Sequence, residues 1–211
     1  MTLLLSALQK LRNSKLEKEI QGRLKSFISL KHGSAKAWFS ELCFCILAAN
    51  AKSRTSWNIQ KELGFRGFMA LSQDDLAAVI LKNKHRFHNT KAKYIIENRQ
   101  HQDIKNKLKP IIGGQGIGSA RAWLVANIKG FGYKEASHFL RNVGYFELAI
   151  LDRHINNVML EHGIIKEIPP LSPKNYLEIE KKFLKLSEQT GMQPGELDMY
   201  MWYMEAGEVL K

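Results

Sequence analysis

A tight glycine hairpin that opens directly into a helix constrains the fold of this chain more than any other feature. Gly130 and Gly132 stand two positions apart, and glycine permits positive φ and a close approach of the backbone to a ligand. Apolar residues then recur at helical spacing until Gly144, which is a predicted helix C-cap. The apolar run 146–151 is too short for a helix of its own, so it is predicted to be a buried connector.

A lysine and an aspartate lie at the entrances of the two helices in this region. Lys134 falls in the first turn after the hairpin, and Asp152 follows eighteen positions later (152 − 134), where the N-cap of a helix ending at Gly163 is expected. An antiparallel return of the chain would bring the amine and the carboxylate to one cleft. A lysine beside a helix N-terminus can act as a nucleophile when it is partly desolvated. Singly, a solvated lysine and a capping aspartate are the commoner explanations, and only their combination with the hairpin favours chemistry.

The chain is strongly basic. Among its 211 residues, 32 Lys and Arg against 20 Asp and Glu give a net charge of +12, which favours a polyanionic partner such as nucleic acid. Cys43 and Cys45 point to different faces of one apolar helix, so no disulfide is expected and a reducing compartment fits. The sequence shows neither a signal peptide nor a membrane-length apolar run, so an intracellular location, in cytoplasm or nucleoid, is expected.

Helical periodicity continues along the rest of the chain. Residues 2–30 alternate apolar and charged positions with a break at 13–14, and the helix after Ser34 is apolar nearly all round, as a central buried helix is. Four glycines in 112–118 predict a flexible or tightly turned loop. The further predicted elements are a helix over 54–63, a turn at 64–67, a helix over 76–82 behind Ser72, helices capped by Thr90 and by Ser119, a rigid linker at 168–173, and two last helices.

Period-2 strand patterns and hairpin dipeptides do not occur in the sequence, so the predicted fold class is all-α. A chain of 211 residues suits a single unit made of two helical lobes. Because the proline-rich linker lets the last helices return onto the first ones, the lobes are predicted as 1–33 plus 164–211 and as 34–163. A cleft is expected between the two lobes.

The motif G-F-G-Y-K at 130–134, followed by L-D-R-H-I at 151–155, resembles the helix–hairpin–helix–Gly/Pro–Asp superfamily of DNA base-excision glycosylases. The wider stretch 134–155 looks like the second, largely archaeal group of 8-oxoguanine DNA glycosylases/AP lyases, and the resemblance extends over the whole chain. Two cysteines are too few for the four-cysteine iron–sulfur cluster of the endonuclease III-like branch. Lys129 departs from the proline that many superfamily members carry there, which adds a cation beside any bound phosphate.

The resemblance implies roles for particular residues. Lys134 would be the Schiff-base nucleophile and Asp152 its catalytic partner, in a DNA-binding cleft of helix–hairpin–helix glycosylase architecture. In this group an aromatic residue of the last helix stacks on the damaged base, and Trp202 occupies the corresponding place, with Asp198 one helical turn before it. A nearby aspartate and the terminal lysine help to recognise the base in the same group, which implies such roles for Asp198 and Lys211.

Further contacts with DNA are expected outside this pocket. The basic loop 84–89 carries Phe87, which suits stacking on a flipped base or on the duplex. Backbone N–H groups of the hairpin and of the helix start would hold a phosphate without reading the base sequence. This predicted backbone-binding site consists of Lys129, Gly130, Phe131 and Gly132, and Lys52 and Arg121 could add positive charge to it.

The predicted function is that of a bifunctional enzyme, which excises 8-oxoguanine from double-stranded DNA and then cuts the strand. Lys134 would attack C1′ of the flipped nucleotide, Asp152 would stabilise the developing positive charge, and β-elimination would cut 3′ to the lesion. These steps require no cofactor and no metal, and a monomer without membrane contact is expected.

The alternatives are a sister glycosylase for another oxidised base, a non-enzymatic helix–hairpin–helix module that grips DNA, and an all-α interaction protein. A DNA-gripping module needs neither Lys134 nor Asp152, and an interaction protein leaves the hairpin and the basic charge unexplained.

Overall fold

The structure, a computed structural model, describes residues 2–170 and 172–211, and every regular element in that part of the chain is a helix. The predicted all-α fold class is confirmed. The predicted break at 13–14 separates the first two helices, and the side chains of Ser14, Ser34 and Ser72 each accept an N-cap hydrogen bond. The helices are α1 (Thr2–Arg12), α2 (Lys15–His32), α3 (Ala35–Ala48), α4 (Ser53–Ala70), α5 (Gln73–Lys82), α6 (His88–Asn98), the 3-10 turn η1 (Arg99–His101), α7 (Ile104–Gln115), α8 (Ile117–Asn127), α9 (Tyr133–Asn142), α10 (Arg153–Glu161), α11 (Pro173–Thr190) and α12 (Pro194–Ala206).

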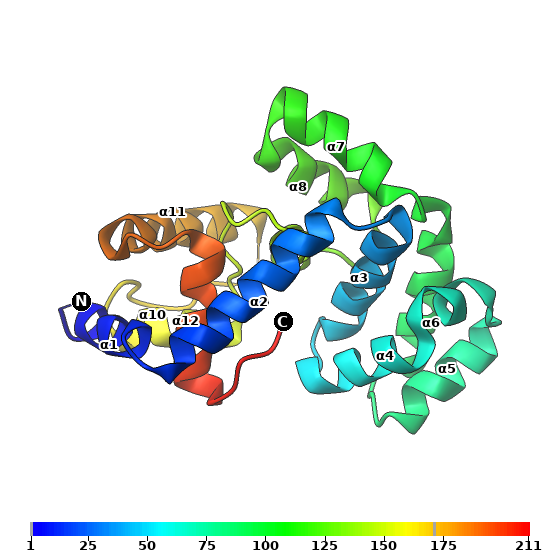
Figure 1. The fold of residues 1–211 in the computed structure, drawn as a ribbon, viewed down its shortest axis with the longest axis horizontal. Coiled ribbons are helices and arrows are strands. Elements are labelled where there is room, and N and C mark those ends of the chain that lie inside the picture. Colours follow the sequence, from blue (N-terminus) through cyan, green and yellow to red (C-terminus); the bar gives the residue numbers. More distant parts are fainter. Residues whose placement is uncertain (1, 171) are drawn as a thin grey trace.

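The helices form two lobes (Figure 1). Each lobe has its own apolar core. The central lobe consists of α3 to α9, and the terminal lobe joins α1 and α2 to α10, α11 and α12. The predicted lobe boundary at Gly163 is wrong, because the apolar face of α10 is buried in the core of the terminal lobe. The two cores meet between Leu148 and Ala149, so the buried connector, and not the proline-rich linker, carries the chain from the central lobe back to the terminal one.

Two predicted turns are largely helical in the structure. Within the turn predicted at 64–67 only Gly64 departs from helical geometry, with φ 54°, and α4 continues beyond it. The prediction of a loop at 112–118 is wrong, because α7 and α8 occupy this segment. Only Gly116, with φ 85°, separates the two helices. Isoleucines on both sides of these glycines pack against the central core, and this packing overrides the low helix propensity of glycine.

Two predicted caps are wrong and one cap was not foreseen. The helix expected behind Thr90 already begins at His88, and the Ser119 hydroxyl donates to the carbonyl of Gln115 at 3.1 Å from within α8. Ser172 instead caps α11 by accepting the N–H of Asn175 at 3.1 Å. The predicted linker at 168–173 includes residue 171, which lies outside the described residues.

Cys43 and Cys45 are both free and buried in the central helix α3. Burial raises the pKa of both thiols well above the ordinary value, which makes them unreactive packing residues. Among the helices of residues 2–170 and 172–211, none is both long enough and apolar enough to span a bilayer.

Candidate active site

A cavity lined by residues of both lobes contains five of the ten predicted site residues. Lys134 comes from α9 of the central lobe, whereas Asp152, Asp198 and Trp202 come from the terminal lobe, and Lys211 also lines the cavity. The antiparallel return of the chain therefore places the lysine and the aspartate in one cavity. The other lining residues are Ser53, His138, Arg141, Ile150, Met199, Val209 and Leu210.

Lys134 enters the cavity from the first turn of α9. Its side chain is 21% exposed, and its Nζ lies 3.9 Å from Oε1 of Glu135. The other oxygen of that carboxylate accepts the N–H of Gly132 at 3.1 Å, so Glu135 closes the hairpin onto the helix. Because 3.9 Å is a loose ion pair, the amine of Lys134 is free to turn toward a substrate.

Asp152 is both the N-cap of α10 and a wall of the cavity. Its Oδ1 accepts the N–H of Ile155 at 2.9 Å, which confirms the predicted cap. Oδ2 has no hydrogen bond or ion pair within the described part of the chain, so one oxygen holds the helix while the other is available to a ligand. The preceding residues Ile150 and Leu151 are buried, and they fix the backbone from which Asp152 projects.

A buried ion pair and a buried histidine lie deeper in the cavity. Nη1 of Arg141 donates to Oδ2 of Asp198 at 3.1 Å, and these side chains are only 5% and 7% exposed. Burial raises the pKa of Asp198 to about 7, Arg141 opposes this rise, and the charge of Asp152 adds to it. Burial also lowers the pKa of His138 well below its usual value, so this imidazole is neutral. The cavity thus contains a carboxyl group that titrates near neutrality.

Trp202 forms an aromatic wall of the cavity. The ring of His154, on α10, meets its indole edge-on with 5.9 Å between ring centroids. Nδ1 of His154 in turn lies 3.6 Å from Oε2 of Glu205 on α12. A partly exposed indole that neighbouring side chains hold in place suits stacking on a planar ligand.

Lys211 lines the cavity, but its ammonium group is engaged elsewhere. Nζ lies 2.6 Å from Oε2 of Glu41 and 2.5 Å from Oε1 of Gln60, and 4.3 Å from the ring centroid of Phe44. Glu41 is only 3% exposed and also accepts a hydrogen bond from Asn142 at 2.7 Å. The resemblance implied that Lys211 helps to recognise the base, and a contact through its ammonium group would require the loss of these bonds.

Phe87 does not line the cavity. It lies in the loop before α6 and is 42% exposed, with the guanidinium of Arg86 above its ring at 5.2 Å. The loop is fixed by His85, whose Nε2 lies 2.9 Å from the carbonyl oxygen of Leu47 at the end of α3. The structure thus presents Phe87 as a surface aromatic residue, which suits contact with the duplex better than contact with a base inside the cavity.

Most of the hairpin backbone N–H groups that were predicted to bind phosphate donate hydrogen bonds within the protein instead. Lys129 donates to the side chain of Asn98 at 3.1 Å, Phe131 to the carbonyl of Ile128 at 3.1 Å, and Gly132 to Glu135. Phe131 is also buried in the central core, so its side chain anchors the hairpin instead of facing a ligand. Gly130, with φ 88°, keeps its N–H without a partner among the described residues, and the first-turn N–H groups of α9 are free of intrahelical bonds.

Arg121, which was expected to add charge for phosphate, is buried and paired with Glu180. Lys52 and Lys129 are exposed and remain available to a polyanion. The prediction for Arg121 is therefore wrong, because a guanidinium with a buried carboxylate partner cannot turn outward to neutralise DNA.

Sequence reasoning missed several residues of the site. His138 and Arg141 follow Lys134 at i+4 and i+7, which is the spacing of one helix face, so this spacing was the available signal. Asn98 holds both the N–H and the carbonyl of Lys129, at 3.1 and 3.0 Å. The sequence carries no local signal for Asn98, because the contact joins the end of α6 to a hairpin 31 residues later.

Asp198 makes the stability of the protein depend on pH. Because its pKa of about 7 in the folded state lies above the ordinary aspartate value of 3.8, the folded state binds more protons than the unfolded state between these values. Relative to Asp198→Asn, the wild-type free energy of unfolding should therefore fall as the pH rises from about 4 to about 7, by at most about 1.4 kcal/mol per pH unit. Urea unfolding of both proteins from pH 4.5 to 8 measures this difference. Parallel curves, or a wild type that gains stability with pH, would contradict it.

Gly130→Ala should damage the hairpin. A Cβ at this position would meet Cδ2 of Tyr94 at 2.5 Å, at a φ of 88° that non-glycine residues avoid. We expect a loss of about 2–4 kcal/mol in the free energy of unfolding, together with weaker binding to duplex DNA. Gly113→Ala is the matched control, because a Cβ there meets nothing within 4 Å, and it should stabilise α7 by about 0.5–1 kcal/mol. Equal effects at both positions would contradict the role of Gly130.

The geometry agrees with comparisons to known proteins. The family model described as 8-oxoguanine DNA glycosylase matches residues 20–192. A protein of Methanocaldococcus jannaschii called 8-oxoguanine DNA glycosylase/AP lyase is 43% identical over 210 residues, which cover 99% of this chain and 100% of that protein. A Thermoplasma volcanium protein of the same name is 43% identical over 91% of both chains.

Solved structures show the same fold. The M. jannaschii 8-oxoguanine glycosylase/lyase in complex with a 15mer DNA containing 8-oxoguanine matches with a TM-score of 0.94 at 42% identity, over 99% of this chain and 100% of that chain. The 8-oxoguanine DNA glycosylase of Thermotoga maritima matches with a TM-score of 0.91 at 40% identity, over 100% and 99% of the two chains. A family match over most of the chain and relatives above 40% identity agree with each other, and the chain belongs to the 8-oxoguanine DNA glycosylase family.

Proposed function

We propose that this protein excises 8-oxoguanine from double-stranded DNA and then cuts the strand at the resulting site. The observation that carries the proposal is the presence of Lys134 and Asp152 in one cavity, with Trp202 as an aromatic wall. Neither a phosphate-binding module nor an interaction protein needs an amine and a free carboxylate oxygen at the same cavity. The relatives named 8-oxoguanine DNA glycosylase/AP lyase support the same activity.

The first chemical step uses Lys134 as nucleophile. Its unprotonated amine attacks C1′ of the flipped nucleotide, the bond between C1′ and N9 of the base breaks, and the base leaves with the bonding electrons and takes up a proton. Asp152 lies beside the sugar, where its carboxylate stabilises the positive charge that develops at C1′. The same carboxylate helps to remove a proton from the attacking amine, so the two residues act as a pair.

The second step cuts the strand. Opening of the sugar ring gives a Schiff base between C1′ and Nζ of Lys134, which makes the protons on C2′ acidic. Loss of one C2′ proton then expels the 3′ phosphate by β-elimination, and hydrolysis of the Schiff base returns the free amine. Lys134 supplies the nucleophile, water hydrolyses the Schiff base, and a single chain suffices for the catalytic pair because both lobes belong to it.

The damaged base would occupy the cavity beside Trp202. The indole suits stacking on the purine, and the carboxyl group of Asp198 at its inner end suits contact with the polar edge of the base. Phe87, exposed on its loop, would stack on the duplex outside the cavity. These positions divide the predicted base-contacting residues into an inner group and an outer one.

The hairpin would hold the DNA backbone. Gly130 and the first turn of α9 offer N–H groups without partners, and the exposed ammonium of Lys129 stands beside them. Such contacts position DNA without reading its sequence, and they place the strand at the helix that carries Lys134. The net charge of +12 supports binding of a polyanion by the rest of the surface.

Base release from matched duplexes tests the proposed substrate. Duplexes that carry 8-oxoguanine opposite cytosine, thymine glycol opposite adenine, or undamaged guanine opposite cytosine are compared under single-turnover conditions. We expect release of 8-oxoguanine to be at least about 100-fold faster than release of either other base. Faster release of thymine glycol would indicate a sister glycosylase for oxidised pyrimidines. Tight binding without release from any duplex would indicate a DNA-gripping module.

A further inference from the structure

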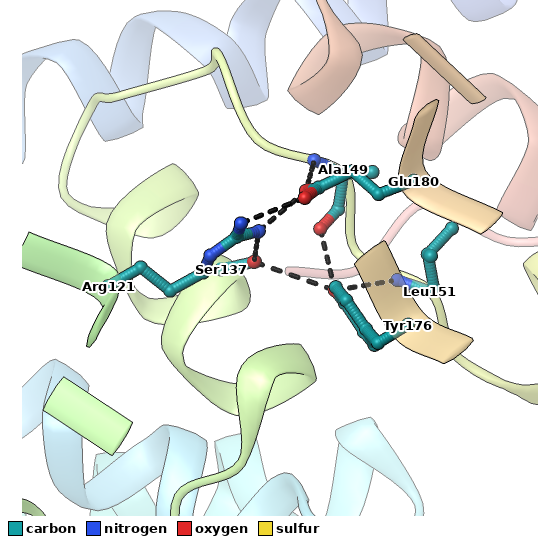
Figure 2. A network of polar contacts seen from close by, with 6 residues as sticks. All are labelled: Arg121, Ser137, Ala149, Leu151, Tyr176 and Glu180. Carbon is teal, nitrogen blue, oxygen red and sulfur yellow. Dashed lines mark hydrogen bonds and ion pairs between the residues drawn. The ribbon is translucent and has the colours of Figure 1, made fainter. Parts of the chain in front are cut away.

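A buried polar network joins the two lobes at the connector that carries Ala149 and Leu151 (Figure 2). Arg121 of α8 donates two hydrogen bonds to the carboxylate of Glu180 on α11, at 2.5 and 2.8 Å, and the two side chains are only 7% and 6% exposed. Arg121 also donates to the hydroxyl of Ser137 on α9 at 3.3 Å. The network therefore ties α8 and α9 of the central lobe to α11 of the terminal lobe.

The same network holds the backbone that leads into Asp152. Oε1 of Glu180 accepts the N–H of Ala149 at 3.2 Å. The hydroxyl of Tyr176, also on α11, donates to the carbonyl of Ala149 at 2.8 Å and accepts the N–H of Leu151 at 3.2 Å. Figure 2 shows both side chains reaching the connector from α11. Three backbone groups immediately before Asp152 are thus fixed by side chains of Tyr176 and Glu180.

The network also reaches the helix that carries the nucleophile. Ser137 follows Lys134 by three positions on α9, and its hydroxyl lies 3.3 Å from Arg121 and 3.5 Å from the hydroxyl of Tyr176. One set of bonds therefore fixes both the start of α10, where Asp152 projects, and the first turns of α9, where Lys134 projects. The two catalytic residues belong to different lobes, so their separation depends on whatever sets the lobes relative to each other.

A buried network of this kind fixes the positions of the groups that it joins more than it adds stability. A buried ion pair is costly to desolvate, and apolar residues of similar volume often stabilise a core equally well or better. Directional bonds to Ala149 and Leu151, in contrast, allow only one position for the connector. Apolar packing alone would hold the lobes together without specifying where Asp152 stands.

We propose that Arg121, Glu180 and Tyr176 are positioning residues that set Asp152 against Lys134 for the reaction. This inference rests on the proposed function, because it assumes that these two side chains act as a catalytic pair. The three residues do not line the cavity, and they act on the pair through the connector. Misplacement of a reacting group by about 1 Å can cost about 100-fold in rate, so loss of a bond in this network should be visible in the chemical step.

Tyr176→Phe is the sharpest test, because it removes one hydroxyl and keeps the ring. The centroid of this ring lies 5.5 Å from that of Tyr133. We expect the single-turnover rate of 8-oxoguanine release to fall by about 10- to 100-fold, with unchanged affinity for a duplex that carries a tetrahydrofuran abasic analogue. Tyr200→Phe is the matched control, since the hydroxyl of this fully buried tyrosine has no hydrogen-bond partner among the described residues. It should leave the rate unchanged.

A double-mutant cycle separates positioning from general stability. If Tyr176 acts through Asp152, adding Tyr176→Phe to Asp152→Asn should cause no further loss of rate, measured well below the unfolding temperature of each protein. Equal losses in both backgrounds, or a wild-type rate in folded Tyr176→Phe, would overturn the proposal. Glu180→Gln, which keeps the shape of the side chain, should behave like Tyr176→Phe and provides a second variant if Tyr176→Phe fails to fold.

The same variants on an abasic duplex distinguish this inference from the proposed substrate. Formation of the Schiff base at an abasic site needs Lys134 and Asp152 but no particular base. If wild type forms the borohydride-trapped adduct there and releases no 8-oxoguanine, the proposed substrate fails while the positioning role is still measured by the trapping rate. If Tyr176→Phe and Tyr200→Phe trap as fast as wild type, the positioning role fails whatever the substrate.

Discussion

Lys134→Gln should lower the single-turnover rate of 8-oxoguanine release by about 10⁴-fold or more, while the variant still binds duplex DNA. Glutamine cannot attack C1′ or form a Schiff base. Its size is close to that of lysine, and the wild-type amine has only a loose ion pair at 3.9 Å with Glu135, so little of the fold depends on the charge. Release of the base from a labelled duplex measures the single-turnover rate, and fluorescence anisotropy with an uncleavable duplex measures the affinity for DNA.

Lys129→Gln is the matched control for this substitution. Lys129 is an exposed lysine at the same hairpin. Its substitution should weaken DNA binding and reduce the salt dependence of that binding, but it should leave the rate of the chemical step unchanged. A Lys134→Gln variant that releases the base at more than about one hundredth of the wild-type rate would mean that water, and not Lys134, is the nucleophile.

Asp152→Asn should lower the rate of base release by about 10²–10³-fold without a comparable loss of stability. Asparagine caps a helix as well as aspartate does, so the bond from Ile155 that Oδ1 now accepts at 2.9 Å can persist. What is lost is the negative charge beside the sugar. Single-turnover kinetics and the free energy of unfolding, measured on one preparation, separate these two effects.

Two further substitutions isolate the cap from the charge. Asp152→Ala should lose both activity and about 1 kcal/mol of stability, because the N-cap bond disappears with the carboxylate. Ser172→Ala removes an equivalent cap from α11, where the hydroxyl accepts the N–H of Asn175 at 3.1 Å, and it should cost stability alone. If Asp152→Asn retains full activity, the carboxylate has no part in the chemistry.

Sequence signals predicted those features of the site that depend on residues close together in the chain. The glycine at 130 has the positive φ that the hairpin requires, Lys134 lies in the first turn after it, and Asp152 caps the next helix. Each of these features depends on neighbouring residues and on helix-terminus chemistry. The pairing of Asp198 and Trp202 along α12 followed in the same way from the helical repeat.

Contacts between distant segments were not predictable from these signals. Nothing near Arg121 indicates that Glu180, 59 residues later, neutralises it, and nothing near Lys211 indicates that Glu41 and Gln60 hold its ammonium. A lone charged residue in a sequence is ordinarily assigned to the surface, which is why Arg121 was expected at the DNA. Tertiary packing likewise overrode the local tendency of the glycines in 112–118 to form a loop.

The lobe boundary was misplaced for a related reason. The proline-rich linker gave a visible break in composition, whereas the actual crossing occurs inside an apolar connector that resembles any other core segment. The connector is buried, and Tyr176 and Glu180 hold it from α11. The segment that separates the two cores is thus also the segment that presents Asp152.

Borohydride trapping tests the central claim most directly. Wild type and Lys134→Gln are each incubated with a duplex that carries one 8-oxoguanine opposite cytosine, and covalent adducts are resolved by denaturing electrophoresis. We predict a covalent protein–DNA adduct with wild type and none with Lys134→Gln, which would establish the substrate, the Schiff base and its nucleophile together. An adduct of equal yield with both proteins, or base release by wild type without any adduct, would contradict the assignment of Lys134.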